Sequence, residues 1–201
     1  MKKLFISFIL FLSIFYTYSL NLNSVKIVYN SHEILLCMKK YHDKYGREYV
    51  NYTEVYNTVQ YWSNQYDIDL AFALSFFAIE SGFTYECMSH QNALGMGQVT
   101  EVALKDYNAW YGKEISVKDL NNKQHYDINI MVTLGYIRMC WDRYSVIQSG
   151  DDLIKSYNVG IGNLKNIKNG TYSEDNYWTI SANKYSDKFN EIYSNFMKCR
   201  R

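Results

Sequence analysis

Residues 67–82 read Asp-Ile-Asp-Leu-Ala-Phe-Ala-Leu-Ser-Phe-Phe-Ala-Ile-Glu-Ser-Gly, and the rest of the chain is most simply interpreted as support for this stretch. Asp67 and Asp69 are both suited to the N-cap of a helix, and Gly82 is suited to its end. Between them the stretch is apolar on every side of a helix, which places such a helix in the centre of a domain or in a membrane. Because about a dozen residues is too short to span a bilayer, the sequence predicts a buried central helix.

The last turn of this predicted helix ends in a carboxylate, Glu80. Apolar surroundings disfavour the charged form of a carboxyl group, and the C-terminal end of a helix adds the negative end of the macrodipole. Both effects raise the pKa, so that Glu80 could protonate a leaving group near neutral pH, as glycoside cleavage requires. The alternative is that Glu80 turns out to solvent, and this helix alone does not decide between the two.

The N-terminus has the composition of an export signal. Lys2 and Lys3 precede an almost unbroken apolar run over residues 4–16, and residues 17–19 only approximate the usual cleavage pattern. We expect residues 1–20 to be a signal peptide or an N-terminal membrane anchor, and the protein to be exported to the periplasm or cell envelope. We expect residues 21–201 to form a single domain, since about 180 residues suit one core.

Composition narrows the choice of partner. The formal charge of +1 becomes about −1 without residues 1–20, and neither value favours nucleic acid or an anionic membrane surface. Neither the histidines nor the cysteines have metal-ligand spacing, so we expect no metal and no cofactor. In an exported protein the cysteines could form one or two disulfides, with three possible pairings, or stay free. They are Cys37, Cys87, Cys140 and Cys199.

Apolar residues at helical spacing predict further helices. Gly135 lies inside one of them at a cost of about 1 kcal/mol relative to Ala, which a close helix crossing would explain. Residues 83–94 and 163–178 are predicted to be loops. The other predicted helices cover residues 31–45, 53–65, 101–107, 127–141, 151–158 and 181–198.

Two glycine-containing segments follow the central helix. Residues 95–98 read Gly-Met-Gly-Gln, where two glycines permit close approach of the backbone to a ligand and Gln98 offers an amide donor and acceptor. Residues 157–162 read Tyr-Asn-Val-Gly-Ile-Gly, where the phenol of Tyr157 and the amide of Asn158 can hydrogen-bond a carboxyl group or a sugar. Each segment alone is also compatible with an ordinary turn.

Four motifs in series resemble the soluble lytic transglycosylase family, which shares the goose-type lysozyme fold. The resemblance covers about residues 65–195 and implies a mainly helical, lysozyme-like domain whose cleft binds peptidoglycan glycan strands. It also implies a Glu-Ser motif that supplies the catalytic acid and base. The motifs are Glu80-Ser81-Gly82-Phe83, Ala93-Leu94-Gly95-Met96-Gly97-Gln98, Asn129 with Gly135, and Tyr157-Asn158-Val159-Gly160-Ile161-Gly162.

The resemblance also implies a reaction. Glu80 would protonate the oxygen that bridges N-acetylmuramic acid and N-acetylglucosamine, and would then act as a base. The muramyl C6 hydroxyl would attack its own C1 to give a 1,6-anhydro end, and this proximity removes the need for a second acid. The residues that would bind substrate, hold the site or orient Glu80 are Ser81, Met96, Gln98, Tyr157 and Asn158.

The chain departs from the family pattern at Gly97, where Met is common, and at Asn92, where Gly is frequent. Three downstream acids, Glu86, Glu101 and Asp106, keep a second interpretation open. If one of them reached across the cleft, the enzyme would be a hydrolytic muramidase. We interpret each as a solvated charge, because none lies in an apolar run.

A third interpretation is a glycan-binding or assembly protein without turnover, although a binding protein has no need for a desolvated acid. The aromatic residues Tyr85, Tyr111 and Trp178 could stack on sugar rings or could serve the core and surface. We expect a monomer that acts on peptidoglycan, and hypothesise that it opens the cell wall for an envelope-spanning secretion or motility machine.

Overall fold

The computed structural model describes residues 29–45 and 49–199, so the expected signal or anchor over residues 1–20 lies outside the described residues. Within these ranges the regular structure is helical, with nine α-helices, one short 3-10 helix and only isolated β-bridges. The elements are α2 (Ser31–Tyr45), α3 (Tyr52–Gln65), α4 (Leu70–Glu80), α5 (Glu101–Tyr111), α6 (Val117–Leu120), η1 (Lys123–His125), α7 (Tyr126–Arg143), α8 (Gly150–Val159), α9 (Ile161–Lys168) and α10 (Tyr177–Met197).

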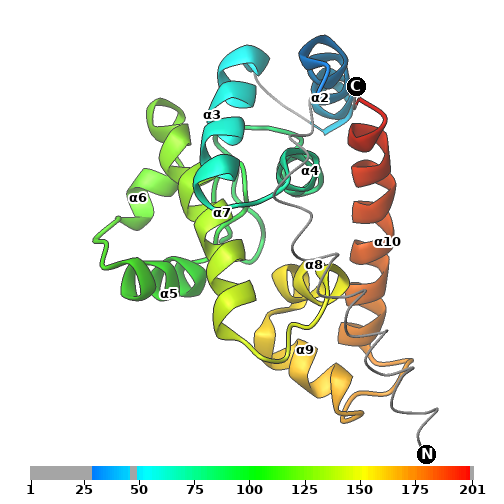
Figure 1. Ribbon diagram of the computed structural model, residues 1–201. Coiled ribbons are helices and arrows are strands. Elements are labelled where there is room, and N and C mark those ends of the chain that lie inside the picture. Colours follow the sequence, from blue (N-terminus) through cyan, green and yellow to red (C-terminus); the bar gives the residue numbers. More distant parts are fainter. Residues whose placement is uncertain (1–28, 46–48, 200–201) are drawn as a thin grey trace, which may run out of the picture.

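The predicted central helix is α4. Asp69 caps it by accepting a hydrogen bond from the backbone N–H of Phe72 at 3.0 Å. Eight of its 11 residues are buried, and its one buried hydroxyl, that of Ser75, donates to the carbonyl of Ala71 at 2.7 Å. It packs against α2, α3 and α10, and Figure 1 shows it in the middle of the described helices. The prediction of a buried central helix is confirmed.

The longest described helix is α10, with 21 residues. It runs along one side of the molecule and packs against both α4 and α8 (Figure 1). Its apolar face carries Phe189, whose ring lies 5.1 Å from the ring of Phe72 and 4.7 Å from that of Phe76, measured between centroids. This packing sets α10 along α4, and Tyr185, one turn before Phe189, reaches Glu80 at the C-terminal end of α4.

One predicted loop is a helix. The sequence predicts a polar loop over residues 163–178, but α9 occupies residues 161–168. Gly160, with a φ of 81°, ends α8 and lets the chain turn directly into α9. The prediction was wrong because α9 has few apolar residues, and a single one of them, Leu164, is buried, at 1% exposure.

Gly135 lies in α7 where the aromatic rings of neighbouring elements approach it. A Cβ atom at this position would lie 2.4 Å from Cε2 of Tyr107 and 2.9 Å from Cζ of Tyr66. The hydroxyl of Tyr111 donates to the carbonyl of Gly135 at 3.1 Å. The predicted close approach is therefore confirmed, and packed rings are what require the glycine.

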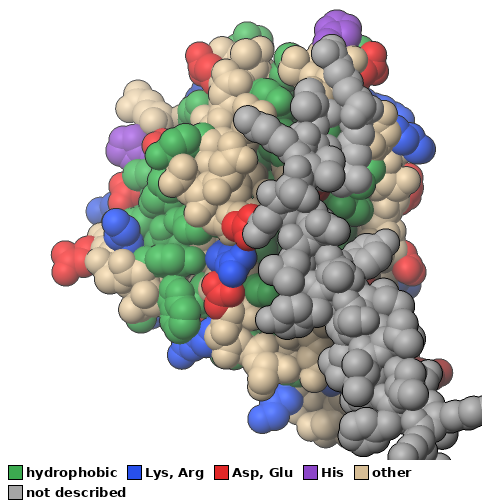
Figure 2. All heavy atoms as spheres, viewed as in Figure 1, with side chains coloured by type: hydrophobic (Ala, Val, Ile, Leu, Met, Phe, Trp, Pro, Cys, Tyr) green, Lys and Arg blue, Asp and Glu red, His purple; other side chains and the backbone are tan. Residues whose placement is uncertain are grey.

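The surface and the cysteines complete the description. All four cysteines are free thiols. No described helix has both the length and the hydropathy to cross a membrane. On the face shown in Figure 2, acidic and basic side chains of the described residues are interspersed rather than separated by sign. A nucleic-acid surface gathers basic side chains along one face, and the described part of this face has no such stripe.

Candidate active site

Glu80 is the last residue of α4 and lines a pocket of about 390 Å³, together with Ser81, Glu86, Cys87 and Gln98. Its carboxyl group accepts a hydrogen bond from the hydroxyl of Tyr185 in α10. The C-terminal end of α4 thus places one carboxyl group in the lining of a pocket, with the apolar core behind it.

The surroundings of Glu80 favour its neutral form. Burial raises its pKa from the ordinary 4.5 to about 7, although the hydrogen bond from Tyr185 and the positive charge of Lys188 both lower it. The negative end of the α4 dipole acts in the same direction as burial. A carboxyl group with a pKa near 7 can both donate and accept a proton at neutral pH.

Tyr185 is the residue that sequence reasoning missed. The sequence places it on the apolar face of the last helix, as a core side chain. In the structure, burial and the negative charge of Glu80 raise its pKa well above the ordinary value, which keeps its hydroxyl protonated as a donor. The available signal was a phenol on an apolar face, since a buried phenol needs a hydrogen-bond partner. The partner lies 105 residues earlier in the chain, which no local pattern reveals.

Ser81 joins the end of α4 to the segment around residues 95–98. Its hydroxyl donates to the carbonyl of Met96 at 2.8 Å and accepts from the backbone N–H of Thr84 at 3.2 Å. On the other side, Nδ1 of the buried His42 lies 2.9 Å from the carbonyl of Gly82. Hydrogen bonds on two sides therefore hold the segment that follows Glu80.

The 95–98 segment is anchored by Asn129 of α7, which is 1% exposed. The Asn129 side chain accepts from the backbone N–H of Gly97 at 2.8 Å and donates to two carbonyls, one of them that of Leu120 at 2.9 Å. A Cβ atom would lie 2.1 Å from the Leu120 carbonyl oxygen at Gly95, and 2.0 Å from Oγ1 of Thr133 at Gly97. A Met at position 97 would therefore clash with α7, which explains this departure from the family pattern.

Met96 differs from the expectation. Its side chain is fully buried in the core, at 0% exposure, and cannot contact a ligand in the pocket. The reason is that the glycines on either side press this segment against α7, which turns the side chain inward. Met96 contributes its carbonyl to Ser81 instead.

A second pocket, of about 400 Å³, is lined by Gln98, Tyr157, Asn158 and Trp178 among others. Gln98 lines both pockets, so the two adjoin at its side chain. The structure thus brings Gln98, Tyr157 and Asn158 to one pocket, and Gln98 also lines the pocket of Glu80.

Tyr157 and Asn158 do not hydrogen-bond to Glu80. The hydroxyl of Tyr157 donates to the carbonyl of Gly97 at 2.6 Å, and Oδ1 of Asn158 accepts from the hydroxyl of Ser181 at 2.9 Å. The first bond ties α8 to the 95–98 segment, and the second ties α8 to α10. The hydrogen bond that orients Glu80 comes from Tyr185, not from these two residues.

Comparison with known proteins identifies the family. Residues 57–180 match the family described as the transglycosylase SLT domain. The chain belongs to this family. The matched range contains Glu80, the 95–98 segment, Asn129 and residues 157–162, so the SLT domain includes every predicted site residue.

Solved structures agree on the fold of this SLT domain. One similar structure is the 70 kDa soluble lytic transglycosylase SLT70 from Escherichia coli, at a TM-score of 0.57 and 13% identity over 71% of this chain and 24% of that chain. Another is an inactive mutant of lytic transglycosylase Slt from Pseudomonas aeruginosa, at a TM-score of 0.54 and 16% identity over 72% of this chain and 24% of that chain. The match thus spans about a quarter of each solved chain. These likenesses confirm the mainly helical, lysozyme-like fold. A search of curated proteins finds no significant match.

The other acids of the SLT domain lie in different places. Glu86 lines the Glu80 pocket, and its carboxylate accepts from the backbone N–H of Lys123 at 2.9 Å. Asp106 lines the second pocket, 3.9 Å from Arg143. Glu101 pairs at 2.9 Å with a lysine on the surface of its own helix. Glu86 is therefore the one of the three that shares a pocket with Glu80.

Of the three aromatic residues considered for sugar stacking, Trp178 lines the second pocket. Tyr85 is 4% exposed, and its hydroxyl accepts from the backbone N–H of Asn51 at 3.0 Å. Tyr111 bonds the carbonyl of Gly135. Across residues 29–45 and 49–199, no group of three or more His, Cys, Asp or Glu side chains is arranged to hold a metal ion.

Proposed function

We propose that this protein is a lytic transglycosylase that cleaves the β-1,4 bond between N-acetylmuramic acid and N-acetylglucosamine without water. The observation that carries the proposal is Glu80, whose pKa is raised to about 7 at the floor of the cleft of an SLT domain. For the similar Pseudomonas aeruginosa Slt, the inactive mutant is one in which Glu is replaced by Gln. That result concerns the other protein, but it supports a glutamate-dependent reaction on this fold.

In the proposed reaction, protonated Glu80 donates its proton to the bridging oxygen, and the bond from that oxygen to the muramyl C1 breaks. The Glu80 carboxylate then takes the proton of the muramyl C6 hydroxyl, whose oxygen bonds to C1. The proton that Glu80 loses is thereby replaced, and no water is consumed. Tyr185 supports the second step, in which Glu80 takes the C6 proton, because its hydroxyl donates to the Glu80 carboxylate.

We assign the remaining residues by what they touch. Gln98, Asn158 and Trp178 line the second pocket, which supports assigning them to contact with the glycan strand. Ser81 and Tyr157 line the pockets but also bond the 95–98 segment, so their first role is to hold the site. The substrate is expected to lie in the Glu80 pocket, to cross Gln98 and to enter the second pocket.

The experiment that tests the proposal is mass spectrometry of muropeptides released from purified peptidoglycan sacculi. Products lighter by one water than the hydrolytic ones, and absent with Glu80→Gln, are the expected result. Asp106→Asn is the matched control, because it changes another carboxyl group that lines the cleft. Products with ordinary reducing ends would overturn the non-hydrolytic assignment.

One observation favours a second candidate, a hydrolytic muramidase. Glu86 lines the same pocket as Glu80 and could activate water as a second carboxylate. In that case the reducing-end products would disappear with Glu86→Gln as well as with Glu80→Gln. Unchanged anhydro products from Glu86→Gln would exclude this candidate.

The proposed substrate also requires export. The predicted signal or anchor over residues 1–20 would bring the enzyme to peptidoglycan in the periplasm or cell envelope. Fractionation of cells that produce the full chain tests this, and a purely cytoplasmic pool would contradict it. Normal assembly of envelope-spanning machines in a deletion strain would contradict the hypothesis that the enzyme opens the wall for one of them.

A further inference from the structure

The side-chain amide of Gln98 is held by hydrogen bonds from its nitrogen atom, Nε2. Its Nε2 donates to the carbonyl of Gly95 at 2.8 Å, to Sγ of Cys87 at 3.0 Å and to the carbonyl of Cys87 at 3.4 Å. The backbone N–H of Gln98 also donates to the Gly95 carbonyl, at 3.0 Å, and Gln98 has a left-handed φ of 52°. The amide nitrogen therefore faces the protein.

This orientation follows from chemistry. Two of the three partners of Nε2 are carbonyl oxygens, which can only accept hydrogen bonds. A flipped amide would place Oε1 against both of these oxygens and would lose both of those bonds. The Cys87 thiol donates to the Gly95 carbonyl at 3.3 Å, which leaves its sulfur lone pairs to accept from Gln98. The Cys87 side chain and the carbonyls therefore fix which end of the amide points outward.

The outward end is Oε1. No described residue donates a hydrogen bond to it, and Gln98 lines both pockets at the point where they adjoin. An amide oxygen accepts and cannot donate. A substrate group at this point must therefore supply an N–H or O–H, whereas the oxygen of a carbonyl or carboxylate would be repelled by the amide oxygen of Gln98.

We infer that Cys87 is a positioning residue that fixes the Gln98 amide with its oxygen toward the cleft, so that the junction of the two pockets takes a hydrogen-bond donor of the glycan. Sugar hydroxyls and the N–H of an acetamido group are donors of this kind. The inference rests on the proposed function for its ligand, because it takes the cleft to bind a glycan strand. The orientation of the amide rests on the contacts of Cys87 and Gly95 alone.

The binding test uses the full chain carrying Glu80→Gln, so that no turnover occurs, and an N-acetylglucosamine tetramer as the probe. Cys87→Ala is expected to weaken binding by about 3–10-fold, the usual range for one lost hydrogen bond. Cys87→Ser should keep binding within about twofold, because a hydroxyl also accepts and donates. In a Gln98→Ala background, Cys87→Ala should weaken tetramer binding by less than a further factor of about two, because the effects of coupled residues are not additive.

Two results would overturn the positioning role. One is an equal loss from Cys87→Ala with and without Gln98, which would mean that Cys87 acts independently of the amide. The other is a loss from Cys87→Ser as large as that from Cys87→Ala. Melting temperatures of all variants accompany the binding data, because a purely structural role would lower them without this dependence on Gln98.

Amide hydrogen exchange by NMR tests the orientation without any ligand. The side-chain N–H protons of Gln98 should exchange with solvent more slowly than those of Gln91, an exposed glutamine that lines the second pocket. Cys87→Ala should speed up the Gln98 exchange. Equal exchange at Gln98 and Gln91 in the parent protein would refute the fixed amide. A parent that binds no tetramer but has a protected Gln98 amide would count against the proposed function and leave the orientation supported.

Discussion

Glu80 and Asp152 are both partly buried carboxyl groups, but they lie at opposite ends of their helices. Glu80 ends α4, where the helix dipole is negative, and Asp152 lies in the first turn of α8, where the dipole is positive. The pKa of Glu80 is raised to about 7, whereas that of Asp152 is lowered. The same fold thus keeps the pKa of one carboxyl group near 7 and holds another carboxyl group as an anion.

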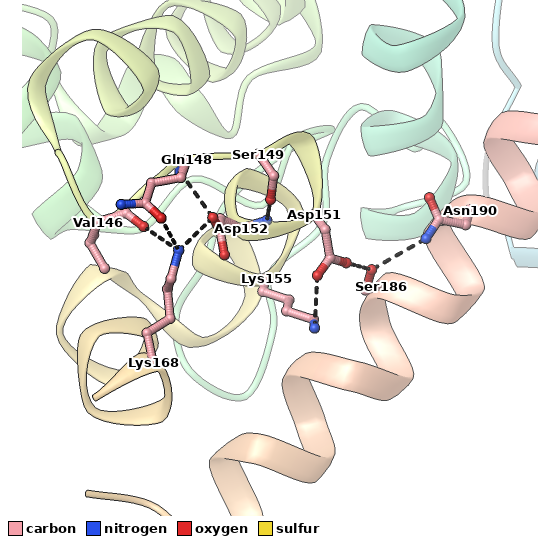
Figure 3. Close-up of polar contacts among 9 residues, drawn as sticks. All are labelled: Val146, Gln148, Ser149, Asp151, Asp152, Lys155, Lys168, Ser186 and Asn190. Carbon is pink, nitrogen blue, oxygen red and sulfur yellow. Dashed lines mark hydrogen bonds and ion pairs between the residues drawn. The ribbon is translucent and has the colours of Figure 1, made fainter. Parts of the chain in front are cut away.

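The contacts of Asp152 explain its charge (Figure 3). Its carboxylate accepts from Nζ of Lys168 at 2.7 Å and from the backbone N–H of Gln148 at 2.9 Å. Burial alone would raise its pKa, but these bonds and that of Ser149 outweigh burial and lower it. Lys168 belongs to α9 and also donates to the carbonyl of Val146 at 3.0 Å. The ion pair therefore holds α9 to the first turn of α8, and the bond to Val146 holds α9 to the segment that precedes α8.

Glu80 has a different kind of partner. It accepts from the phenol of Tyr185, which carries no charge at neutral pH, and the charge of Lys188 lowers its pKa less than burial raises it. A proton therefore stays on Glu80 until about neutral pH. The comparison teaches that the charge of the partner, and not burial alone, decides whether a carboxyl group stabilises this fold or can transfer a proton.

The largest expected effect is on catalysis. Glu80→Gln should lower the rate of anhydro product formation by about 10²–10⁴-fold, the usual contribution of general acid–base catalysis. Asp152→Asn, the same chemical change at the other carboxyl group, should leave the rate within about threefold at a temperature where it is folded. Initial rates on sacculi measure both. Comparable losses from the two variants would mean that the contrast between the two sites has no catalytic meaning.

The next effect is on the pH dependence of stability, and its sign differs between the two sites. The folded state raises the pKa of Glu80, so its contribution to stability is present below 4.5 and is lost as the pH rises through about 7. Glu80→Gln should therefore stabilise the protein at pH 8 by up to about 3 kcal/mol and change little at pH 4. Urea unfolding at both pH values measures this.

Asp152 should behave in the opposite way. Its folded-state pKa is lowered, so its contribution is present above the ordinary 3.8 and is lost as the pH falls through the folded value. The destabilisation by Asp152→Asn should therefore be largest near neutral pH and shrink in acid. If both variants had the same pH dependence, the two environments would not differ as described.

The third effect is the stability that the ion pair supplies. Lys168→Met should destabilise the protein by about 1–3 kcal/mol, because it leaves a largely buried carboxylate and a carbonyl without their donor. Lys155→Met is the matched control, since Lys155 pairs with the more exposed Asp151 of its own helix at 2.8 Å and such pairs contribute about 0.3–0.5 kcal/mol. Equal losses in urea unfolding would show that Lys168 is an ordinary surface residue.

The sequence predicts one half of the candidate site much better than the other. Local composition is enough to place α4 and the carboxyl group of Glu80 at its end, because a short, wholly apolar helix must be buried. It leaves Asp67 and Asp69 as equal candidates for the cap, which the structure gives to Asp69. It does not reveal Tyr185, because the contact depends on how α10 crosses α4. Cys87 is missed for a different reason, since a lone cysteine in a loop has no pattern that links it to Gln98.

The fold shows the same limit. Most predicted helices are present because their apolar faces have helical spacing, but α9 was missed because a single one of its residues is buried. Asn129 enters the sequence argument only through the family motif, and its three bonds, to Gly97, Leu94 and Leu120, depend on how these segments pack against α7. Met96 was assigned to the substrate because its neighbours permit close approach, and the same glycines bring it against the core.

The smallest effect concerns the one bond that distinguishes Glu80 from an unpartnered buried acid. Tyr185→Phe removes the donor to the carboxylate, so the pKa of Glu80 should rise further, because that hydrogen bond lowers it. The basic limb of the kcat/KM profile should then move to higher pH, while the maximal rate falls by about 3–10-fold because the carboxylate that must take the C6 proton is less well held. Tyr193→Phe on the same helix is the control, and its profile should stay in place. A lower rate with an unmoved basic limb would mean that Tyr185 supports packing alone, and that its hydroxyl does not help to set the pKa of Glu80.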